Sequence, residues 1–186
     1  MNKLKTKEIV FCALFVALIA VGAFIQVPVP GMDYFTLQFF FVVMVGILLG
    51  SRLGAFAVLA YVLIGLAGVP IFAAGGGLTY IVRPSFGYLI GFIAAAFLTG
   101  FVAEKITANS FKTYLIACLA GFVICYAIGL VYKYFMLNYY VGEGTAFWMV
   151  IADCFPLDMP GDILLSVLAA IVAVRLKPIA KKMIFM

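Results

Sequence analysis

The stretch GILLGSRLGA, Gly46 to Ala55, joins two long apolar runs through a turn that carries a single charge, Arg52. The runs on either side, residues 36–50 and 53–69, read as membrane-crossing helices. Because the connection from Gly50 to Arg52 is so short, the chain must reverse direction there, and the two helices are expected to be antiparallel neighbours. This stretch therefore predicts a helical membrane bundle.

The composition extends this prediction to the whole chain. Of its 186 residues, 68% are apolar and 10% are charged, whereas soluble domains use roughly 45–50% apolar residues. Histidine is absent, which removes the usual metal ligand and the usual near-neutral base. The four cysteines show no C-x-x-C spacing and read as packing thiols. We therefore expect an integral membrane protein with no metal site and no bound cofactor.

Six apolar spans can be drawn along the chain. They cover about residues 9–27, 36–50, 53–69, 85–102, 113–132 and 160–175. With a cytosolic N-terminus, ten of the twelve Lys and Arg residues lie inside and only Arg83 and Lys133 lie outside, as the positive-inside rule requires. Residues 1–186 are thus predicted to form one compact, all-α bundle of six transmembrane helices in the cell membrane, with both termini cytosolic. The cations then set the orientation of the chain in the membrane and contact lipid headgroups, and no nucleic acid is expected as a partner.

Several segments need a separate interpretation. The first span follows a short basic head, but it is longer than the roughly 7–15 residues of a signal-peptide core, so a retained helix is favoured over a cleaved signal. Residues 147–155 are apolar but too short to cross, which predicts a re-entrant or interfacial piece. Pro84 is expected in the first turn of the fourth span, and Arg83 before it in extended backbone.

Three polar residues are candidate ligand contacts. Asp162 falls in the first turn of the sixth span, where it either complements the helix dipole or binds a ligand, and an ionisable group at this depth is by default a functional candidate. Arg83 could grip a ligand carboxylate with its guanidinium, or it could lie at the interface as a snorkelling cation. Gln38 could hydrogen-bond a ligand or another helix.

Small residues mark two further features. Gly75, Gly76 and Gly77 form a loop whose backbone can approach a ligand closely or close over it. No Lys-Ser/Thr follows these glycines, so ATP hydrolysis by this chain is not expected. Ala13 and Ala17 form a small-x-x-x-small pair that lets another helix approach closely.

Taken together, the motifs resemble a known family. They are PVP at 28–30, TLQ at 36–38, GILLGSRLGA at 46–55, GVPIFA at 68–73, PSFGYLIGF at 84–92 and PGD at 160–162. In this order they are similar to the signature of the BioY family, the biotin-specific substrate-binding (S) components of energy-coupling-factor (ECF) transporters. The resemblance runs over nearly the whole chain, which makes it more specific than any single glycine motif.

The resemblance implies a six-helix S component and no enzymatic activity. Such a component captures biotin from outside and delivers it inward with an energising module, which consists of a transmembrane coupling subunit and two cytosolic ATPases. The pair Ala13 and Ala17 resembles the Ala-x-x-x-Ala motif through which S components contact the coupling subunit.

The resemblance also suggests how the ligand is held. Asp162 would accept hydrogen bonds from the ureido N–H groups of biotin, and Arg83 would pair with its carboxylate. Gln38 or Thr79 would bond the remaining polar edge. Tyr88 would cover the apolar rings.

One position departs from the family. Many members carry Lys three residues after the Asp of PGD, and this chain has Leu165, so either Arg83 holds the carboxylate alone or the ligand is another vitamin or a biotin-like compound. Another alternative is a self-sufficient secondary carrier with a coupling-ion site at Asp153, Asp158 or Asp162. An intramembrane enzyme with opposed aspartates ranks lower, because these three residues fall in or near one loop.

Overall fold

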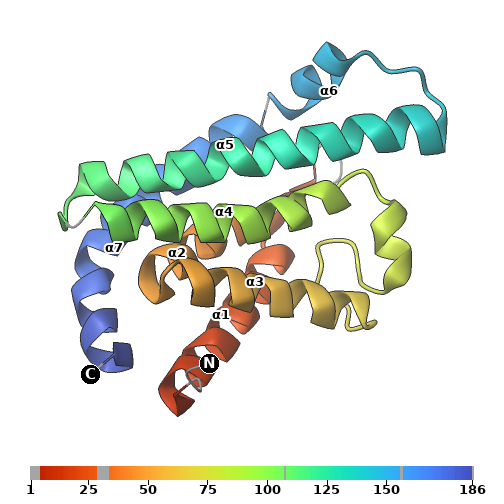
Figure 1. Cartoon of the computed structure of the whole chain (residues 1–186). Helices are drawn as coiled ribbons and strands as arrows, with labels where there is room; N and C mark the ends of the chain where they lie inside the picture. The colour runs from red at the N-terminus through yellow and green to blue at the C-terminus, as the bar shows by residue number, and fades with distance from the viewer. Residues whose placement is uncertain (1–4, 29–33, 107, 156, 186) are drawn as a thin grey trace.

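A computed structural model of the chain describes residues 5–28, 34–106, 108–155 and 157–185, and shows a bundle of helices (Figure 1). The α-helices are α1 (Thr6–Phe24), α2 (Gln38–Leu49), α3 (Ser51–Leu66), α4 (Phe86–Lys105), α5 (Phe111–Phe135), α6 (Phe147–Cys154) and α7 (Asp158–Phe185). A 3-10 helix, η1 (Leu78–Val82), precedes α4, and a π-helical turn, η2 (Met136–Val141), continues α5.

Among the described residues, four helical segments are long and apolar enough to cross a membrane. They are Thr6–Phe24, Phe86–Lys105, Phe111–Val141 and Asp158–Ile184. The second and third predicted spans correspond instead to the shorter helices α2 and α3. At a rise of about 1.5 Å per residue, the 12 residues of α2 extend only about 18 Å, less than the roughly 30 Å hydrocarbon layer.

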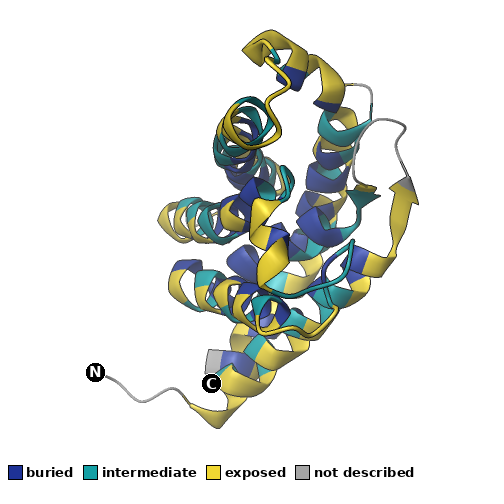
Figure 2. Cartoon of the chain, turned by 90° about the vertical axis from the view of Figure 1, so that its right-hand side faces the viewer, coloured by how far each residue is buried: buried dark blue, intermediate teal, exposed yellow. Residues whose placement is uncertain are grey.

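Helix α2 is the centre of the bundle. It contacts α1, α3, α4 and α7, and most of its side chains are buried. Burial on all sides explains why its sequence is apolar throughout rather than amphipathic. Figure 2 shows buried residues on the faces that the helices turn toward one another and exposed residues on their outer faces.

The predicted tight turn between α2 and α3 is confirmed, and the two helices contact each other. Gly50 has a φ of +90°, a conformation that favours glycine. The carboxylate of Glu104 accepts hydrogen bonds from the backbone N–H of Ser51 at 2.8 Å and from its hydroxyl at 2.9 Å. A side chain from the end of α4 therefore caps the start of α3.

Glycines bring α2, α3 and α4 into close contact. A Cβ atom at Gly46 would lie 2.4 Å from the carbonyl oxygen of Ala96, and one at Gly100 would lie 2.5 Å from the backbone nitrogen of Ser51. Real Cβ atoms do not approach other atoms this closely, so the helices can pack at this separation only because these positions lack side chains.

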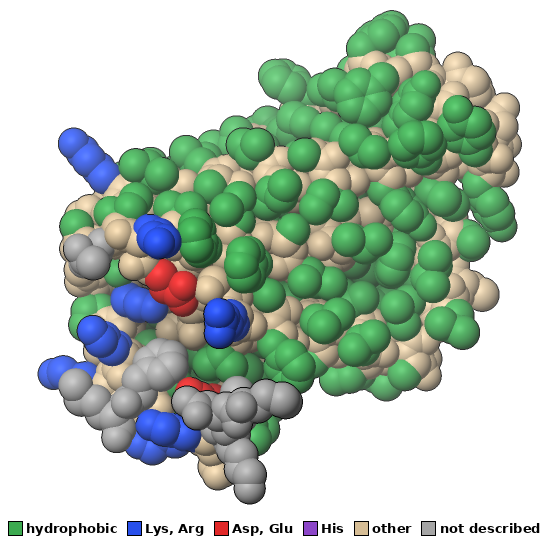
Figure 3. Space-filling view, in the orientation of Figure 1, with side chains coloured by type: hydrophobic (Ala, Val, Ile, Leu, Met, Phe, Trp, Pro, Cys, Tyr) green, Lys and Arg blue, Asp and Glu red, His purple; other side chains and the backbone are tan. Residues whose placement is uncertain are grey.

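Lys and Arg side chains gather at one end of the molecule, here called the basic end, while apolar side chains cover the rest of the visible face (Figure 3). The α2–α3 turn, the α4–α5 connection and the end of α7 lie at this end (Figure 1). The opposite end, here called the cavity end, holds η1, η2 and α6. Exposed apolar residues on the long helices, such as Val123 at 64% exposure and Leu164 at 60%, suit contact with lipid.

Some predicted boundaries shift at the cavity end. Helix α4 begins at Phe86 after Ser85, so Pro84 lies just before the helix and not in its first turn. Arg83 is extended, with φ −80° and ψ 139°, as expected for a residue before proline. Helix α7 begins at Asp158, which places Asp162 in its second turn and not its first.

Two further segments differ from or match the predictions. The strands β1 (Gln26–Pro28) and β2 (Tyr34–Thr36) pair antiparallel, an element missing from the all-α prediction because three-residue strands are too short to show an alternating pattern. Val29 and Pro30 of the PVP motif lie outside the described residues. The predicted interfacial piece at 147–155 corresponds to the short helix α6.

Candidate ligand-binding cavity

A cavity of about 450 Å³ opens at the cavity end, within the range of roughly 300–1,000 Å³ that small-molecule sites occupy. It lies among β2 and the starts of α2, α4 and α7, with α5, η2 and α6 completing the wall. Its lining residues are Tyr34, Phe35, Thr36, Gln38, Phe39, Ala73, Tyr80, Pro84, Ser85, Tyr88, Leu89, Phe92, Tyr126, Lys133, Leu137, Glu143, Asp153, Cys154, Asp158 and Asp162.

A buried carboxylate forms one part of the wall. Asp162 is 9% exposed and accepts a hydrogen bond from the hydroxyl of Tyr126, with 2.9 Å between the oxygens. The Tyr126 ring packs on Phe122, with 4.5 Å between ring centroids, and edge-on against Tyr88 at 5.6 Å. These aromatic contacts fix the hydroxyl that orients the carboxylate.

A second polar group reaches the cavity from α2. The Nε2 of Gln38 donates to the Tyr61 hydroxyl at 2.7 Å, and that hydroxyl donates to the carbonyl oxygen of Ile71 at 2.8 Å. The hydroxyl of Thr36 donates to Gln38 Oε1 at 3.1 Å. Since Nε2 carries two hydrogens and the bond to Tyr61 uses one, Gln38 has a further donor to offer a ligand.

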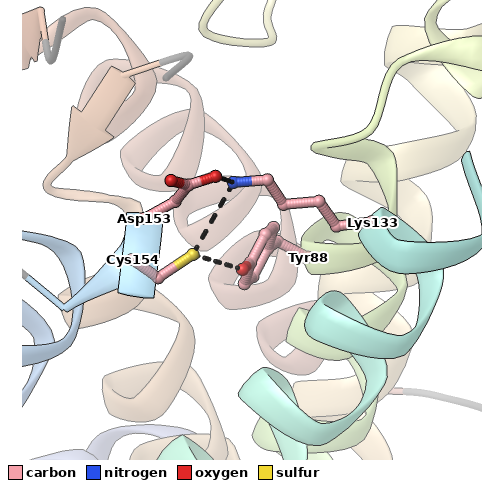
Figure 4. A network of polar contacts seen from close by, with 4 residues as sticks. All are labelled: Tyr88, Lys133, Asp153 and Cys154. Atoms are coloured by element: carbon pink, nitrogen blue, oxygen red, sulfur yellow. Dashed lines mark hydrogen bonds and ion pairs between the residues drawn. The ribbon is translucent and has the colours of Figure 1, made fainter. Parts of the chain in front are cut away.

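A network of four residues joins α4, α5 and α6 beside the cavity (Figure 4). The Tyr88 hydroxyl lies 3.1 Å from the Cys154 sulfur, and the Lys133 Nζ lies 3.9 Å from the same sulfur and 3.7 Å from Asp153 Oδ2. Burial raises the pKa of the Cys154 thiol, although the bond to Tyr88 and the charge of Lys133 act in the opposite direction.

The ionisable groups of the lining are mostly acidic. Lys133 is the one cation among the described residues that line the cavity, whereas the acidic residues Glu143, Asp153, Asp158 and Asp162 all line it. The cavity thus offers several hydrogen-bond acceptors and one site of positive charge.

The structure brings three of the predicted site residues to the cavity, namely Gln38, Tyr88 and Asp162. Arg83 is not among the lining residues. Its guanidinium lies over the ring of Tyr80, 5.5 Å from the centroid, and Tyr80 is the residue that reaches the cavity. The predicted pairing of Arg83 with a ligand carboxylate stays a prediction.

The glycine loop lies next to the cavity without lining it. Gly75 and Gly77 have φ values of +110° and +97°, so both use backbone conformations that other residues rarely adopt. Phe72 and Gly75 exchange two backbone hydrogen bonds, at 2.9 and 3.1 Å, which closes the loop into a turn. Gly76 and Thr79, also predicted as contacts, are likewise not lining residues.

Comparisons with known proteins identify the family. Residues 1–182 match the BioY family. The chain belongs to the BioY family. It is 40% identical over 171 residues to the probable biotin transporter BioY of Lysinibacillus sphaericus, covering 92% of this chain and 87% of that protein. It is 41% identical over 172 residues to the biotin transporter BioY of Thermotoga maritima, covering 92% and 96%.

A solved structure shares the BioY fold. The crystal structure at 2.1 Å of the S-component for biotin from an ECF-type ABC transporter superposes with a TM-score of 0.78 at 24% identity, covering 92% of this chain and 91% of that one. Family and fold agree with the apolar helices described above. This BioY chain is a multi-pass protein of the cell membrane.

Four lining residues of this BioY chain illustrate what the sequence does not reveal. Tyr126 lies inside an apolar run and reads as packing, and Lys133 reads as an interfacial cation next to Tyr132. Cys154 reads as a packing thiol. Ser85 was predicted only as the start of a span, yet its hydroxyl is buried and makes no hydrogen bond to the described part of the chain.

Ala13 and Ala17 lie on an outward face of α1. Both are exposed, with Val10 at 60% and Val21 at 51% exposure on the same helix. The pair is therefore accessible to another protein or to lipid, and its predicted role in binding a coupling subunit stays a prediction.

Proposed function

We propose that this chain is the substrate-capture subunit of a biotin uptake transporter, and that it binds biotin from the outside in the cavity described above. The observation that carries the proposal is the buried Asp162 carboxylate in the wall of a cavity of about 450 Å³. Relatives of 40% and 41% identity that carry the name biotin transporter support the choice of ligand.

The cavity suits the two chemical halves of biotin. The ureido ring presents two N–H donors and one carbonyl acceptor, which Asp162 and the free donor of Gln38 complement. The thioether ring and valeryl chain are apolar and match Phe39 and Phe92 in the lining. Polar groups that a wrong ligand leaves unpaired cost about 1–3 kcal/mol each, so this arrangement selects for the ureido group.

The chain does not supply the energy for uptake in this proposal, and it performs no enzymatic reaction. It works with an ECF module made of a transmembrane coupling subunit and two cytosolic ATPases. The exposed face of α1 at Ala13 and Ala17 is the proposed docking surface, because two small residues one turn apart allow another helix to approach closely.

The geometry favours ligand capture over a self-sufficient carrier. A carrier needs a coupling-ion site, and the candidates were Asp153, Asp158 and Asp162. Asp162 is bound by Tyr126 and Asp153 is paired with Lys133. Both carboxylates line the same cavity, so they serve the ligand site in this proposal.

Equilibrium binding of biotin to the purified chain in detergent tests the proposal. We expect the unmodified chain to bind biotin and not riboflavin or thiamine. Asp162→Asn should weaken biotin binding by about tenfold to a hundredfold, because it can place an amide N–H donor opposite the ureido N–H groups, and a buried donor left unpaired costs about 1–3 kcal/mol. Glu8→Gln, which removes a carboxylate at the basic end, is the matched control and should bind as the unmodified chain does. A folded chain that ignores biotin would refute the proposal.

A further inference from the structure

The two cations predicted outside the cytosol differ in their access to the ligand. Lys133 lines the cavity and Arg83 does not. The side chain of Lys133 is only 12% exposed, so most of its surface is shielded from bulk water. A desolvated charge is costly unless an opposite charge or hydrogen bonds compensate it.

The contacts that Lys133 makes within the protein are longer than ideal hydrogen bonds. Its Nζ lies 3.7 Å from Asp153 Oδ2 and 3.9 Å from the Cys154 sulfur. A charge-assisted N–H···O bond is normally about 2.7–2.9 Å long. The ion pair with Asp153 is therefore a loose one, and a closer carboxylate would satisfy the ammonium better.

The other ionisable residues of the lining also favour a ligand carboxylate near Lys133. Glu143, Asp153 and Asp158 also line the cavity, so a ligand carboxylate meets acidic side chains elsewhere along the wall. Close opposite charges attract by several kcal/mol at the effective dielectric of a partly buried site. Only the neighbourhood of Lys133 offers this attraction among the described lining residues.

We propose that Lys133 selects ligands with an ionised carboxylate, and that Asp153 is its resting counter-ion, which the ligand carboxylate displaces. This inference rests on the proposed function, because it assigns the second polar end of biotin to a residue. It replaces Arg83 as the proposed carboxylate partner, and it places the cation on α5.

Asp153 is suited to being displaced. Its side chain is 48% exposed, so water can solvate the carboxylate once it leaves Lys133. It lies on α6, a helix of only eight residues. Cys154, the next residue, keeps its contact with Tyr88 on α4, which holds α6 in place while the neighbouring carboxylate exchanges partners.

Two ligands of the same shape and different charge test the inference. Biotin and biotinamide, its neutral carboxamide, are titrated into the purified unmodified chain and into Lys133→Met, which keeps an unbranched side chain one atom shorter and removes the charge. We expect the unmodified chain to bind biotin at least about tenfold more tightly than the amide, from a charge-assisted bond of about 1.5–3 kcal/mol. In Lys133→Met the affinity for biotin should fall by that factor and the affinity for the amide should stay the same.

Arg83→Met is the matched control, since it removes the other cation of the cavity end, and it should keep the preference for biotin. Asp153→Asn removes the competing carboxylate and should bind biotin more tightly than the unmodified chain, with amide binding unchanged. Glu143→Gln removes an equal charge from the lining and should change biotin affinity less than Asp153→Asn. Thermal unfolding of each variant confirms that it is folded.

Three results would overturn the inference while leaving biotin capture intact. They are equal affinity of the unmodified chain for biotin and biotinamide, loss of the preference in Arg83→Met but not in Lys133→Met, and weaker biotin binding by Asp153→Asn. The Asp153→Asn result decides the question even if Lys133→Met does not fold. If the unmodified chain binds neither compound, the proposed function itself fails.

Discussion

The hydroxyl of Tyr126 donates a hydrogen bond to the carboxylate of Asp162, with 2.9 Å between the two oxygens. The bond links α5 to α7 across 36 positions of sequence, and both residues are buried. It therefore orients the carboxylate that we propose for the ureido group, and it also holds two long helices together at the cavity.

Tyr126→Phe removes this bond and keeps the ring. We expect weaker biotin binding and a lower free energy of unfolding, each by about 1–3 kcal/mol, because a buried carboxylate loses its partner. Titration calorimetry and thermal unfolding measure the two effects. Tyr114→Phe is the control, since its hydroxyl bonds Asn109 away from the cavity, and it should leave biotin affinity unchanged. Unaltered affinity in Tyr126→Phe would show that the bond plays no part in binding.

Tyr61→Phe should destabilise the chain by about 1–3 kcal/mol. Tyr61 is fully buried, and its hydroxyl serves both Gln38 and the carbonyl oxygen of Ile71, so the substitution leaves an amide and a carbonyl unpaired. The midpoint of thermal unfolding is the measurement. Tyr139→Phe, at a residue that is 80% exposed, should not shift that midpoint, and equal shifts in both variants would contradict the explanation.

Gly46→Ala tests the close approach of α2 and α4. The new methyl group would lie 2.4 Å from the Ala96 carbonyl oxygen, and we expect a loss of stability of about 1–3 kcal/mol from overpacking. Val123→Ile adds one carbon at a site that is 64% exposed and should be neutral. A Gly46→Ala chain as stable as the unmodified one would mean that the helices separate without cost.

Ala17→Leu tests the proposed docking face on α1. Because Ala17 is exposed in the isolated chain, the variant should bind biotin with unchanged affinity. It should co-purify poorly with the coupling subunit and support little ATP-dependent uptake, since the larger side chain keeps the helices apart. Ala127→Leu makes the same change at an exposed position of α5 and should assemble normally. Normal assembly of Ala17→Leu would place the partner elsewhere.

Cys154 should react slowly with maleimide. Burial raises the pKa of its thiol, and the thiolate is the reactive form, so labelling should be slow near pH 7 and accelerate as the pH rises. The measurement uses a chain whose other cysteines are alanine. An exposed cysteine, Val141→Cys in a background lacking Cys154, should label faster at every pH below the raised pKa. Equal rates would show that the thiol is accessible.

The sequence predicted those features that have a local pattern. The distribution of Lys and Arg predicted a basic end, and the short Gly50 to Arg52 connection predicted that α2 and α3 are neighbours. The isolated Asp162 in an apolar segment and the early Gln38 in α2 were recognised as candidates, because buried polar side chains are rare in membrane helices.

Features that depend on distant partners could not be predicted in this way. Glu104 caps α3 from 53 residues away, whereas recognisable capping motifs lie within one turn. Tyr126 and Lys133 read as packing and interfacial residues until the fold places them beside Asp162 and Asp153. Arg83 carried the more conspicuous charge, but its position in the loop directs it over Tyr80.

The glycine contacts between α2 and α4 have a consequence for protein design. Gly46 and Gly100, which set how closely these helices pack, are not cavity-lining residues, so scaffold integrity and cargo choice depend on separate positions. A designer could exchange the charges at Asp162 and Lys133 to accept a cationic ligand and leave Gly46 and Gly100 unchanged. The residues that line the cavity can in this sense be redesigned without changing those that pack the helices together.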